Sequence, residues 1–464
     1  MKYVSTRGKA PELDFEDVMI TGLARDGGLY VPKEWPFFSE EMISKMDGCS
    51  YEEIAFQVMR PFIGSTFTDL EFKEIIKKSY KDFSSFERCP VVKLKDNIFV
   101  LELYHGPTLA FKDVAMQLIG QMFELSLKRK NQNVVIVGAT SGDTGSAAIE
   151  AFKGLDSVEV FIMYPDGAVS DVQRRQMTTA TENNVNALAV DGNFDDCQAR
   201  LKDMFNDFDF RDEINLASVN SINWARVMAQ VVYYFTSAIA VGAPKKKVNF
   251  TVPTGNFGDI FAGYVAKKMG LPIEKLIIAT NQNDILDRVV KSGVYKIERV
   301  KPSISPSMDI QVSSNFERAL FDIFSQDSLR IRTLMDELRI SEEFKLTSEE
   351  AEKLQAVFES GSSSEEETND TISSIFEETG TLMCPHSATG TKVAKEKNDD
   401  GDVPMIVLAT ASPAKFPNAV KAASGISPKL PAHMSDLFDR GERVKMVPND
   451  IKRIKEIIIE SINS

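Results

Sequence analysis

Short apolar runs alternate with amphipathic stretches along most of the chain, and this alternation predicts strand–helix units. Each run is followed by a glycine-containing turn and a helical pattern. Because such units build parallel sheets covered by helices on both faces, we predict an α/β fold. Ligands bind beyond the carboxyl ends of the strands, where these turns lie. The units are NVVIVGATSGDTGSAAIEAF at 133–152, VEVFIMYP at 158–165, VNFTVPTGNFGDIFAGYVAKKMG at 248–270 and VPMIVLATASPAKFPNAV at 403–420.

Two other regions have a different pattern. The first 85 residues combine the turn ARDGGLYVP with EFKEIIKKSYKDF, in which apolar residues recur three and four apart. We therefore predict a small N-terminal domain over 1–85, followed by a catalytic region of two α/β subdomains over 86–464. A helical, acidic insertion is expected at about 316–375. Within it, GSSSEEETND at 361–370 predicts an exposed loop, with a partner-binding acidic segment as the alternative.

Composition restricts the classes of partner. The chain has 464 residues, of which 43% are hydrophobic, and its formal net charge of -14 argues against a general polyanion binder. Its four cysteines and three histidines are too dispersed for a zinc site, and no apolar stretch is long enough to cross a bilayer. We therefore expect a cytoplasmic protein that binds no nucleic acid, membrane or metal.

Lys112 lies where a helical pattern begins. Pro107 fixes the preceding loop, and apolar residues recur with helical spacing from Phe111 to Phe123. The positive end of a helix and an apolar neighbourhood both disfavour an ammonium group, so the pKa of this lysine should fall. A neutral amine can form a Schiff base with an aldehyde. The alternative is a surface lysine whose charged group reaches water.

The turn GATSGDTGSA at 138–147 has the composition of an anion site. Thr140, Ser141 and Thr144 supply hydroxyls before a helix that we expect to begin near Ser146. The glycine spacing matches neither a dinucleotide fingerprint nor a Walker loop, so a small carboxylate is the expected ligand. A structural turn with hydroxyl caps is the alternative.

The loop PTGNFGDIFAG at 253–263 is suited to a phosphate. Gly255 and Gly258 let the backbone approach a ligand closely, and the amides from Asn256 to Asp259 can surround a phosphate at a helix start. As a lone glycine-rich loop it is a weak signal.

A second phosphate site is indicated at VNSINWARVMAQ, residues 219–230. Amide, hydroxyl and guanidinium groups occur within seven residues there, a natural phosphate clamp. The alternative is a capped helix start with an arginine on its exposed face. The residues are Asn220, Ser221, Asn223 and Arg226.

Ten stretches of the chain resemble threonine synthases, in the branch of fold-type II pyridoxal-phosphate enzymes that carries an N-terminal extension. They follow the order of that family from residue 3 to residue 416, which separate structural accidents would not do. The stretches are YVSTRG at 3–8, GLARDGGLYVP at 22–32, HGPTLAFKD at 105–113, ATSGDTGSA at 139–147, NSINWAR at 220–226, PTGNFGD at 253–259, SPSMDI at 305–310, SNFERALF at 314–321, PHSATG at 385–390 and TASPAKF at 410–416.

The resemblance implies a role for each motif. Lys112 would be the catalytic lysine that forms the Schiff base with pyridoxal 5'-phosphate. Thr410 would hydrogen-bond the pyridine nitrogen of that cofactor. Ser412 stands where relatives commonly carry histidine, so no role of that histidine is transferred, and the resemblance gives Asp309 none. The cofactor phosphate would be held by Gly255, Asn256, Phe257, Gly258 and Asp259, and the substrate by Thr140, Ser141, Asp143, Thr144, Asn220, Ser221, Asn223 and Arg226.

The implied activity is the conversion of O-phospho-L-homoserine and water to L-threonine and phosphate, the last step of threonine biosynthesis. Two alternatives stay open: a phospho-lyase that releases 2-oxobutyrate, and a non-catalytic homologue that only binds the cofactor. The intact substrate-side motifs favour an enzyme, since a carrier would not need them. We expect a monomer or a homodimer.

Overall fold

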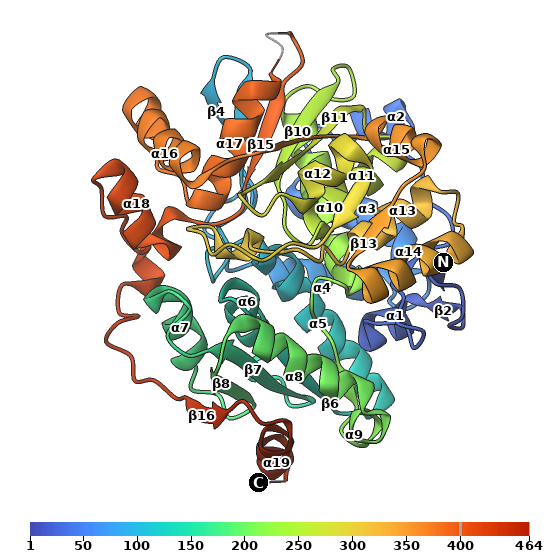
Figure 1. Cartoon of the computed structure of the whole chain (residues 1–464), viewed down its shortest axis with the longest axis vertical. Coiled ribbons are helices and arrows are strands. Elements are labelled where there is room, and N and C mark those ends of the chain that lie inside the picture. Colours follow the sequence, from blue (N-terminus) through green and yellow to red (C-terminus); the bar gives the residue numbers. More distant parts are fainter. Residues whose placement is uncertain (399–400, 464) are drawn as a thin grey trace.

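Two mainly parallel sheets, one in each half of the molecule, organise the computed structural model, which describes residues 1–398 and 401–463 (Figure 1). In the five-stranded sheet all neighbouring strands run parallel, whereas the six-stranded sheet has one antiparallel edge strand, β4. The first sheet has the order β16 (Lys445–Pro448), β8 (Val185–Asp191), β7 (Val158–Pro165), β6 (Val134–Ala139), β9 (Leu216–Ala217). The second has the order β14 (Phe358–Ser362), β11 (Ile273–Thr280), β10 (Val248–Pro253), β15 (Met405–Ala409), β5 (Ile98–Glu102), β4 (Val91–Lys95). The predicted α/β fold is confirmed.

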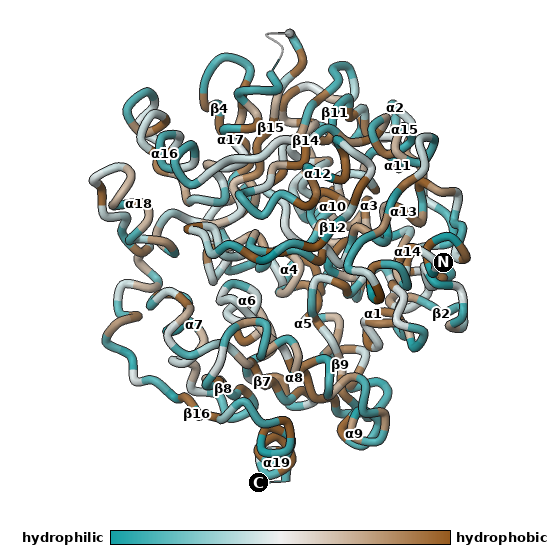
Figure 2. The backbone as a smooth tube through the Cα atoms, viewed as in Figure 1, coloured by the Kyte–Doolittle hydropathy of each residue, from teal (hydrophilic) through white to brown (hydrophobic). Residues whose placement is uncertain are grey.

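Helices cover both faces of each sheet, which explains the continuous apolar runs of the central strands. Every residue of β10 is buried, and Figure 2 shows hydrophobic segments along interior strands such as β7, with hydrophilic residues on outer elements such as α16. A strand covered on both sides has no solvent face, so its residues are apolar throughout and do not alternate between apolar and polar. On the five-stranded sheet α8 (Phe194–Asn206) and α19 (Ile451–Ile462) lie opposite α5 (Lys112–Lys130) and α6 (Asp143–Phe152); on the other, α17 (Pro385–Lys397) lies opposite α10 (Trp224–Ala240) and α11 (Gly258–Lys268).

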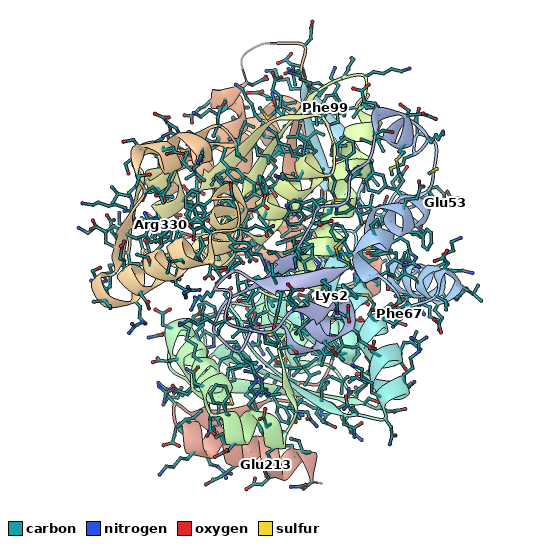
Figure 3. The ribbon with its side chains drawn as sticks, turned by 90° about the vertical axis from the view of Figure 1, so that its right-hand side faces the viewer. Lys2, Glu53, Phe67, Phe99, Glu213 and Arg330 are labelled. Atoms are coloured by element: carbon teal, nitrogen blue, oxygen red, sulfur yellow. The ribbon has the colours of Figure 1, made fainter. Side chains whose placement is uncertain are left out.

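The N-terminal region packs against α5 and α10, which cover different sheets. In Figure 3, Lys2 of β1 lies between Phe99 in the six-stranded half and Glu213 beside the five-stranded half. Its three-stranded antiparallel sheet is β2 (Leu13–Asp14), β1 (Lys2–Ser5), β3 (Tyr30–Pro32), and its helices are α1 (Phe15–Thr21), α2 (Glu40–Ser44), α3 (Tyr51–Ile63) and α4 (Asp69–Tyr80).

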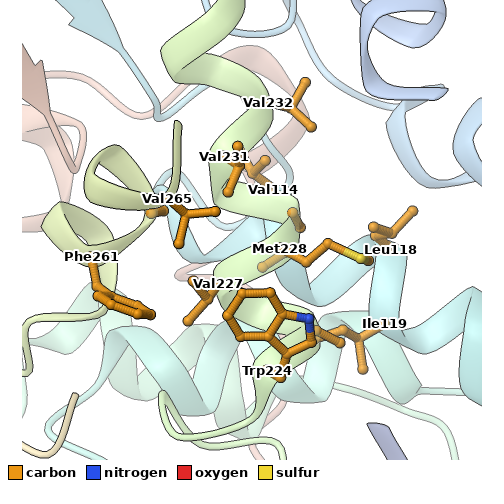
Figure 4. Packing of buried hydrophobic residues seen from close by; sticks show 14 of the residues in the cluster. Val114, Leu118, Ile119, Trp224, Val227, Met228, Val231, Val232, Phe261 and Val265 are labelled. Atoms are coloured by element: carbon orange, nitrogen blue, oxygen red, sulfur yellow. The ribbon is translucent and has the colours of Figure 1, made fainter. Parts of the chain in front are cut away.

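The buried side chains of α10 form the centre of the main core. Figure 4 shows Trp224 and Met228 of α10 beside Leu118 and Ile119 of α5, with Phe261 of α11 nearby. Because α10 is apolar on almost every side, it can pack simultaneously on α3, α5 and α11. The helix therefore has a fixed position, and so has its first turn, which carries Arg226.

The predicted exposed loop at 361–370 is wrong. Residues 358–362 form β14, an edge strand of the main sheet, and α16 (Glu365–Thr379) begins three residues later. Ser364 caps this helix in a reciprocal capping box with Glu367, so the serine and the acidic residues mark a helix start rather than a loop. The predicted helical pattern before β14 is confirmed by α13 (Phe316–Ile323), α14 (Ser328–Ser341) and α15 (Ser348–Gln355). Between α14 and α15 lies a short strand, β13 (Glu343–Lys345), which pairs with the earlier strand β12 (Val294–Lys296).

The remaining elements are short. They are α7 (Asp171–Thr178), α9 (Phe208–Glu213), α12 (Ile285–Ser292), α18 (Pro417–Ser424) and the 3-10 turns η1 (Pro306–Met308), η2 (Pro413–Lys415) and η3 (Ala432–Met434).

None of the helices in the described ranges combines the length and apolar character needed to cross a membrane. The same residues contain no cluster of three or more metal-ligating side chains.

Candidate functional site

A cavity of about 680 Å³ lies where strand ends from both sheets meet the first turns of several helices. The strands are β6, β10 and β15, and the helices that carry predicted site residues are α5, α6, α10 and α11. This is the carboxyl edge at which parallel sheets bind ligands. The structure brings thirteen of the predicted site residues to its wall: Lys112, Ser141, Asp143, Thr144, Asn220, Ser221, Arg226, Gly255, Asn256, Phe257, Gly258, Asp259 and Thr410.

Lys112 is the first residue of α5, as predicted, and its side chain is buried rather than on the surface. Its Nζ lies 3.3 Å from Asp143 Oδ2. Burial lowers the pKa of Lys112, and the positive charges of Arg226 and Lys415 lower it further, while Asp143 opposes the shift. The lysine is therefore biased toward its neutral, nucleophilic form.

Arg226 is a buried cation in the first turn of α10, where the alternative interpretation placed an exposed arginine. It is 3% exposed. Its Nη1 donates to the Val219 carbonyl at 3.3 Å, and its Nε has no hydrogen-bond partner among the described residues. Burial lowers its pKa to about 10. A buried guanidinium of this kind is costly without an anion beside it, so the cavity is suited to an anionic ligand.

The 255–259 loop connects β10 to α11 and is held from outside by residues 313 and 315. Ser313 Oγ donates to the Gly255 carbonyl at 2.6 Å, and Asn315 donates its backbone and side-chain N–H groups to the Asn256 carbonyl. A Cβ at Gly255 would lie 2.8 Å from the Ser307 carbonyl oxygen, so glycine is required there. The first amides of α11 have no partner within the helix, which leaves them for a ligand.

Asp259, in the first turn of α11, is held by two tyrosines. Tyr233 Oη donates to Asp259 Oδ1 at 2.5 Å and Tyr234 Oη at 3.1 Å, whereas Oδ2 has no partner among the described residues. Burial raises the pKa of Asp259 to about 6. This carboxyl group thus fixes α11 against α10 and also reaches the cavity wall.

Thr140 and Asn223 do not line the cavity, because their polar atoms hold the backbone. Thr140 Oγ1 accepts from the amides of Gly142 and Gly145, both at 2.9 Å. Asn223 caps α10 and donates to the carbonyls of Met19 and Ser218. Both side chains shape the loop and helix starts from which Ser141, Thr144 and Arg226 reach the cavity.

The helix after the hydroxyl-rich turn begins at Asp143, three residues before the predicted start near Ser146. Gly142, with a φ of 128°, turns the chain sharply at this point, and the Gly145 amide is already bonded to Thr140. The early start places Asp143 in the first turn, beside Lys112.

Two buried residues at the site were not identified individually from the sequence. Lys415 in η2 is fully buried and lies 2.9 Å from Asp143 Oδ1. His386 in α17 lines the cavity, is 4% exposed and has no hydrogen-bond partner for either ring nitrogen among the described residues. Burial lowers its pKa to about 4, so its ring is neutral at neutral pH. His386 lies in the stretch 385–390 and Lys415 in the stretch 410–416. Both stretches resemble the family, and this resemblance is the sequence signal that could have identified the two residues.

Three family models together cover most of the chain. Residues 2–80 match the threonine synthase N terminus, residues 86–337 match the pyridoxal-phosphate dependent enzymes, and residues 387–458 match the threonine synthase C-terminal region. These matches agree with the site, since they include most of the residues that line the cavity.

Relatives and solved structures match over the full length. A threonine synthase from Pseudomonas aeruginosa is 48% identical over 464 residues, covering 100% of this chain and 99% of the relative. The pyridoxal-phosphate-bound threonine synthase structure from Brucella melitensis superposes with a TM-score of 0.97 at 53% identity, covering 100% of both chains. That of yeast superposes with a TM-score of 0.94 at 41% identity, covering 100% of this chain and 99% of the yeast chain. The chain therefore belongs to the threonine synthase family of pyridoxal-phosphate-dependent enzymes.

Proposed function

We propose that this protein is a threonine synthase that converts O-phospho-L-homoserine and water to L-threonine and phosphate. One observation carries the proposal: a single cavity holds a buried lysine biased toward its neutral form and a buried arginine whose Nε is unpaired among the described residues. The first suits an aldehyde-bearing cofactor and the second a phosphorylated substrate.

The residues present fit pyridoxal 5'-phosphate. Lys112 supplies the amine for its aldehyde, and the start of α11 with its close-approach glycine, Gly255, supplies amides for its phosphate. Thr410, which directly follows β15, supplies a neutral hydroxyl for its ring nitrogen. When bound, the cofactor supplies a conjugated ring that accepts electrons from the substrate.

The residues of the chain carry out the proton transfers and bind the substrate. Lys112, as a free amine, moves protons at the α and β carbons of the substrate, the usual task of a positioned acid–base group. Arg226, with Asn220 and Ser221 beside it, holds the substrate phosphate and stabilises its charge as it leaves. The hydroxyls of Ser141 and Thr144, at the start of α6, hold the substrate carboxylate.

Product analysis tests the proposal. The purified protein should be yellow and, with O-phospho-L-homoserine, should release phosphate and threonine in equal amounts. Release of 2-oxobutyrate in place of threonine would identify a phospho-lyase. A yellow protein that leaves the substrate unchanged would be a cofactor-binding homologue.

The setting of the enzyme is also part of the proposal. We infer a cytoplasmic location, because the four cysteines are all free and a reducing compartment suits them. We also infer a monomer or a homodimer. Cell fractionation and light scattering of the purified protein would test the two statements separately.

A further inference from the structure

Lys415 is a buried charge that the reaction proposed above does not use. Its side chain is completely shielded from solvent. The ammonium group lies 2.9 Å from Asp143 Oδ1 and donates to the Thr108 carbonyl at 2.8 Å. A lysine at such depth needs a specific partner, because an unpaired ammonium in the interior is strongly unfavourable.

Asp143 is shared between two lysines. Its Oδ1 accepts from Lys415 and from Gln173 Nε2, the latter at 2.8 Å, while its Oδ2 faces Lys112. Burial alone would raise the pKa of Asp143, but Lys415 and Lys112 lower it well below its usual range. Asp143 is therefore a permanent carboxylate, and a substrate carboxylate would be repelled by it. Asp143 is therefore not expected to hold the substrate carboxylate.

We propose that Lys415 is a positioning residue: it binds one oxygen of Asp143 and thereby prevents Asp143 from holding Lys112 as a charged ammonium group. This role rests on the proposed function, in which the Lys112 amine must bond to an aldehyde and later carry protons. If Lys415 were absent, Asp143 would have Lys112 as its only lysine partner. A buried ion pair of that kind would favour the charged, non-nucleophilic form of Lys112.

The position of Lys415 is fixed by the loop that precedes Lys112. Thr108, whose carbonyl accepts from Lys415, is itself held by Asp113: Asp113 Oδ1 accepts from the Thr108 hydroxyl at 2.6 Å, and Oδ2 accepts from its amide at 2.8 Å. Asp113 directly follows Lys112 on α5. The two lysines are thus attached to the same short segment, which keeps the distances among the three charges constant.

The other charged groups near Lys112 do not replace this effect. Arg226 on α10 disfavours the ammonium form from one side, and Asp259 on α11 favours it from another. His386 on α17 is neutral above a pH of about 4, its pKa. Lys415 is therefore the cation that competes directly with Lys112 for Asp143.

Removing the charge of Lys415 and the charge of Asp143, one at a time, gives a direct test. The nitrogen of Lys112 is linked to the cofactor in the loaded protein, so the visible absorption of that protein, titrated with pH, reports its protonation. Lys415→Met should raise the midpoint by about one pH unit or more, and Asp143→Asn should lower it by a similar amount. In the Asp143→Asn background, Lys415→Met should shift the midpoint less than it does in the wild type, because Lys415 acts mainly through the Asp143 carboxylate. Lys421→Met, at an exposed lysine of α18, is the matched control and should leave the midpoint unchanged.

A merely structural role predicts a different result. If both single variants bound the cofactor and shifted the midpoint in the same direction, or not at all, the proposed role of Lys415 would be wrong. Should Lys415→Met fail to fold, Lys415→Gln takes its place, because it removes the charge but keeps a donor for the Thr108 carbonyl, and an unchanged midpoint in that variant would overturn the proposed role of Lys415.

Failure of the proposed function would give a separate signature. A wild-type protein without any visible band would contradict the cofactor assignment rather than the role of Lys415. The same pKa shifts are then measured on the full-length chain by labelling Lys112 with trace acetic anhydride across a pH series, followed by mass spectrometry. Unaltered labelling profiles in both single variants would overturn the inference.

Discussion

Burial lowers the pKa of both Arg226 and Lys112, with different chemical consequences. Arg226 keeps its charge at neutral pH, because a pKa of about 10 still leaves it protonated. Lys112 starts from a lower pKa, and two cations as well as burial act on it. One cavity thus contains a permanent cation and an amine that can lose its proton. The cation suits phosphate binding, and the neutral amine suits imine formation.

Arg226→Lys should impair the use of O-phospho-L-homoserine far more than the retention of the cofactor. An ammonium group cannot reproduce the paired contacts of a guanidinium with phosphate. The loss corresponds to about 1.5–3 kcal/mol, or roughly ten- to a hundredfold in kcat/KM. Steady-state kinetics and the visible spectrum would be measured together, with Arg453→Lys on the exposed face of α19 as the control. A variant that loses its cofactor on dialysis but shows normal kinetics once pyridoxal phosphate is added back would show that the two phosphate sites have been exchanged.

Lys112→Ala should separate cofactor binding from proton transfer. The 255–259 loop and Thr410 do not depend on the amine, so the variant should still bind pyridoxal phosphate, without a covalent bond. Phosphate release from the substrate should fall by at least about two orders of magnitude, the usual contribution of a positioned acid–base group. Near-normal phosphate release would mean that another residue moves the protons.

His386→Gln should make the protein less sensitive to acid. The pKa of His386 is lowered to about 4 by burial, from an ordinary value of 6.5. Between these two values the unfolded chain binds more protons than the folded one, so this group makes the folded state less stable as the pH falls. From pH 7 to pH 5 the wild type should lose about 2 kcal/mol more than the variant. Urea unfolding followed by tryptophan fluorescence would measure the difference. His433→Gln, at an exposed histidine, should behave like the wild type.

The start of a helix could be predicted from the sequence where the local pattern is typical of helices alone. The helix starts at Lys112 and Gly258 agree with the sequence pattern, because an apolar period begins at each. The start near Ser146 and the loop at 361–370 were wrong. Serine, glycine and acidic residues occur equally in turns and at helix N-termini, so the local sequence does not distinguish the two.

The site residues could be predicted as motifs, but not all of them as contacts. Thr140 was expected to face a ligand, yet its hydroxyl accepts from two backbone amides. Lys415 lies more than 250 residues beyond Asp143 in the sequence, and only the fold brings the two charges together. Periodicity describes which face of an element is buried, and it contains no information on such long-range polar pairs.

Ser364→Ala should loosen the start of α16. Ser364 Oγ accepts from the Glu367 amide at 3.2 Å, and the Glu367 carboxylate accepts from the Ser364 amide at 2.8 Å. Loss of such a cap costs about 1 kcal/mol, or roughly a fivefold faster exchange of the amides it protects. Hydrogen–deuterium exchange of peptides from the first turn of α16 would measure it. Ser373→Ala, further along the same helix, is the control and should not accelerate exchange there.

The N-terminal region and the catalytic region share one core. Trp224, at the start of α10, packs against Tyr3, Trp35 and Phe62, with ring centroids 5.6–5.9 Å apart. Its indole N–H also donates to the Tyr3 hydroxyl at 3.1 Å. The same helix turn carries Arg226. Packing of the N-terminal region therefore fixes the element that positions the proposed substrate-phosphate site.

Removal of residues 1–85 should consequently prevent folding of the remainder, although the sequence pattern predicts a separate domain there. Without them, Trp224 and the apolar faces of α5 and α10 would be exposed to water, and the lost burial of a single large aromatic side chain already costs about 3–5 kcal/mol. Native stabilities of about 5–15 kcal/mol do not tolerate several such losses. We therefore expect residues 86–464 produced alone to be insoluble, or to lack a cooperative unfolding transition and the cofactor spectrum. Production of residues 1–85 and 86–464 as two chains in the same cell should restore both properties, since the shared core does not depend on the peptide bond between them. A soluble 86–464 fragment with a normal cofactor spectrum would show instead that the two regions fold independently and that the contacts of Trp224 are dispensable.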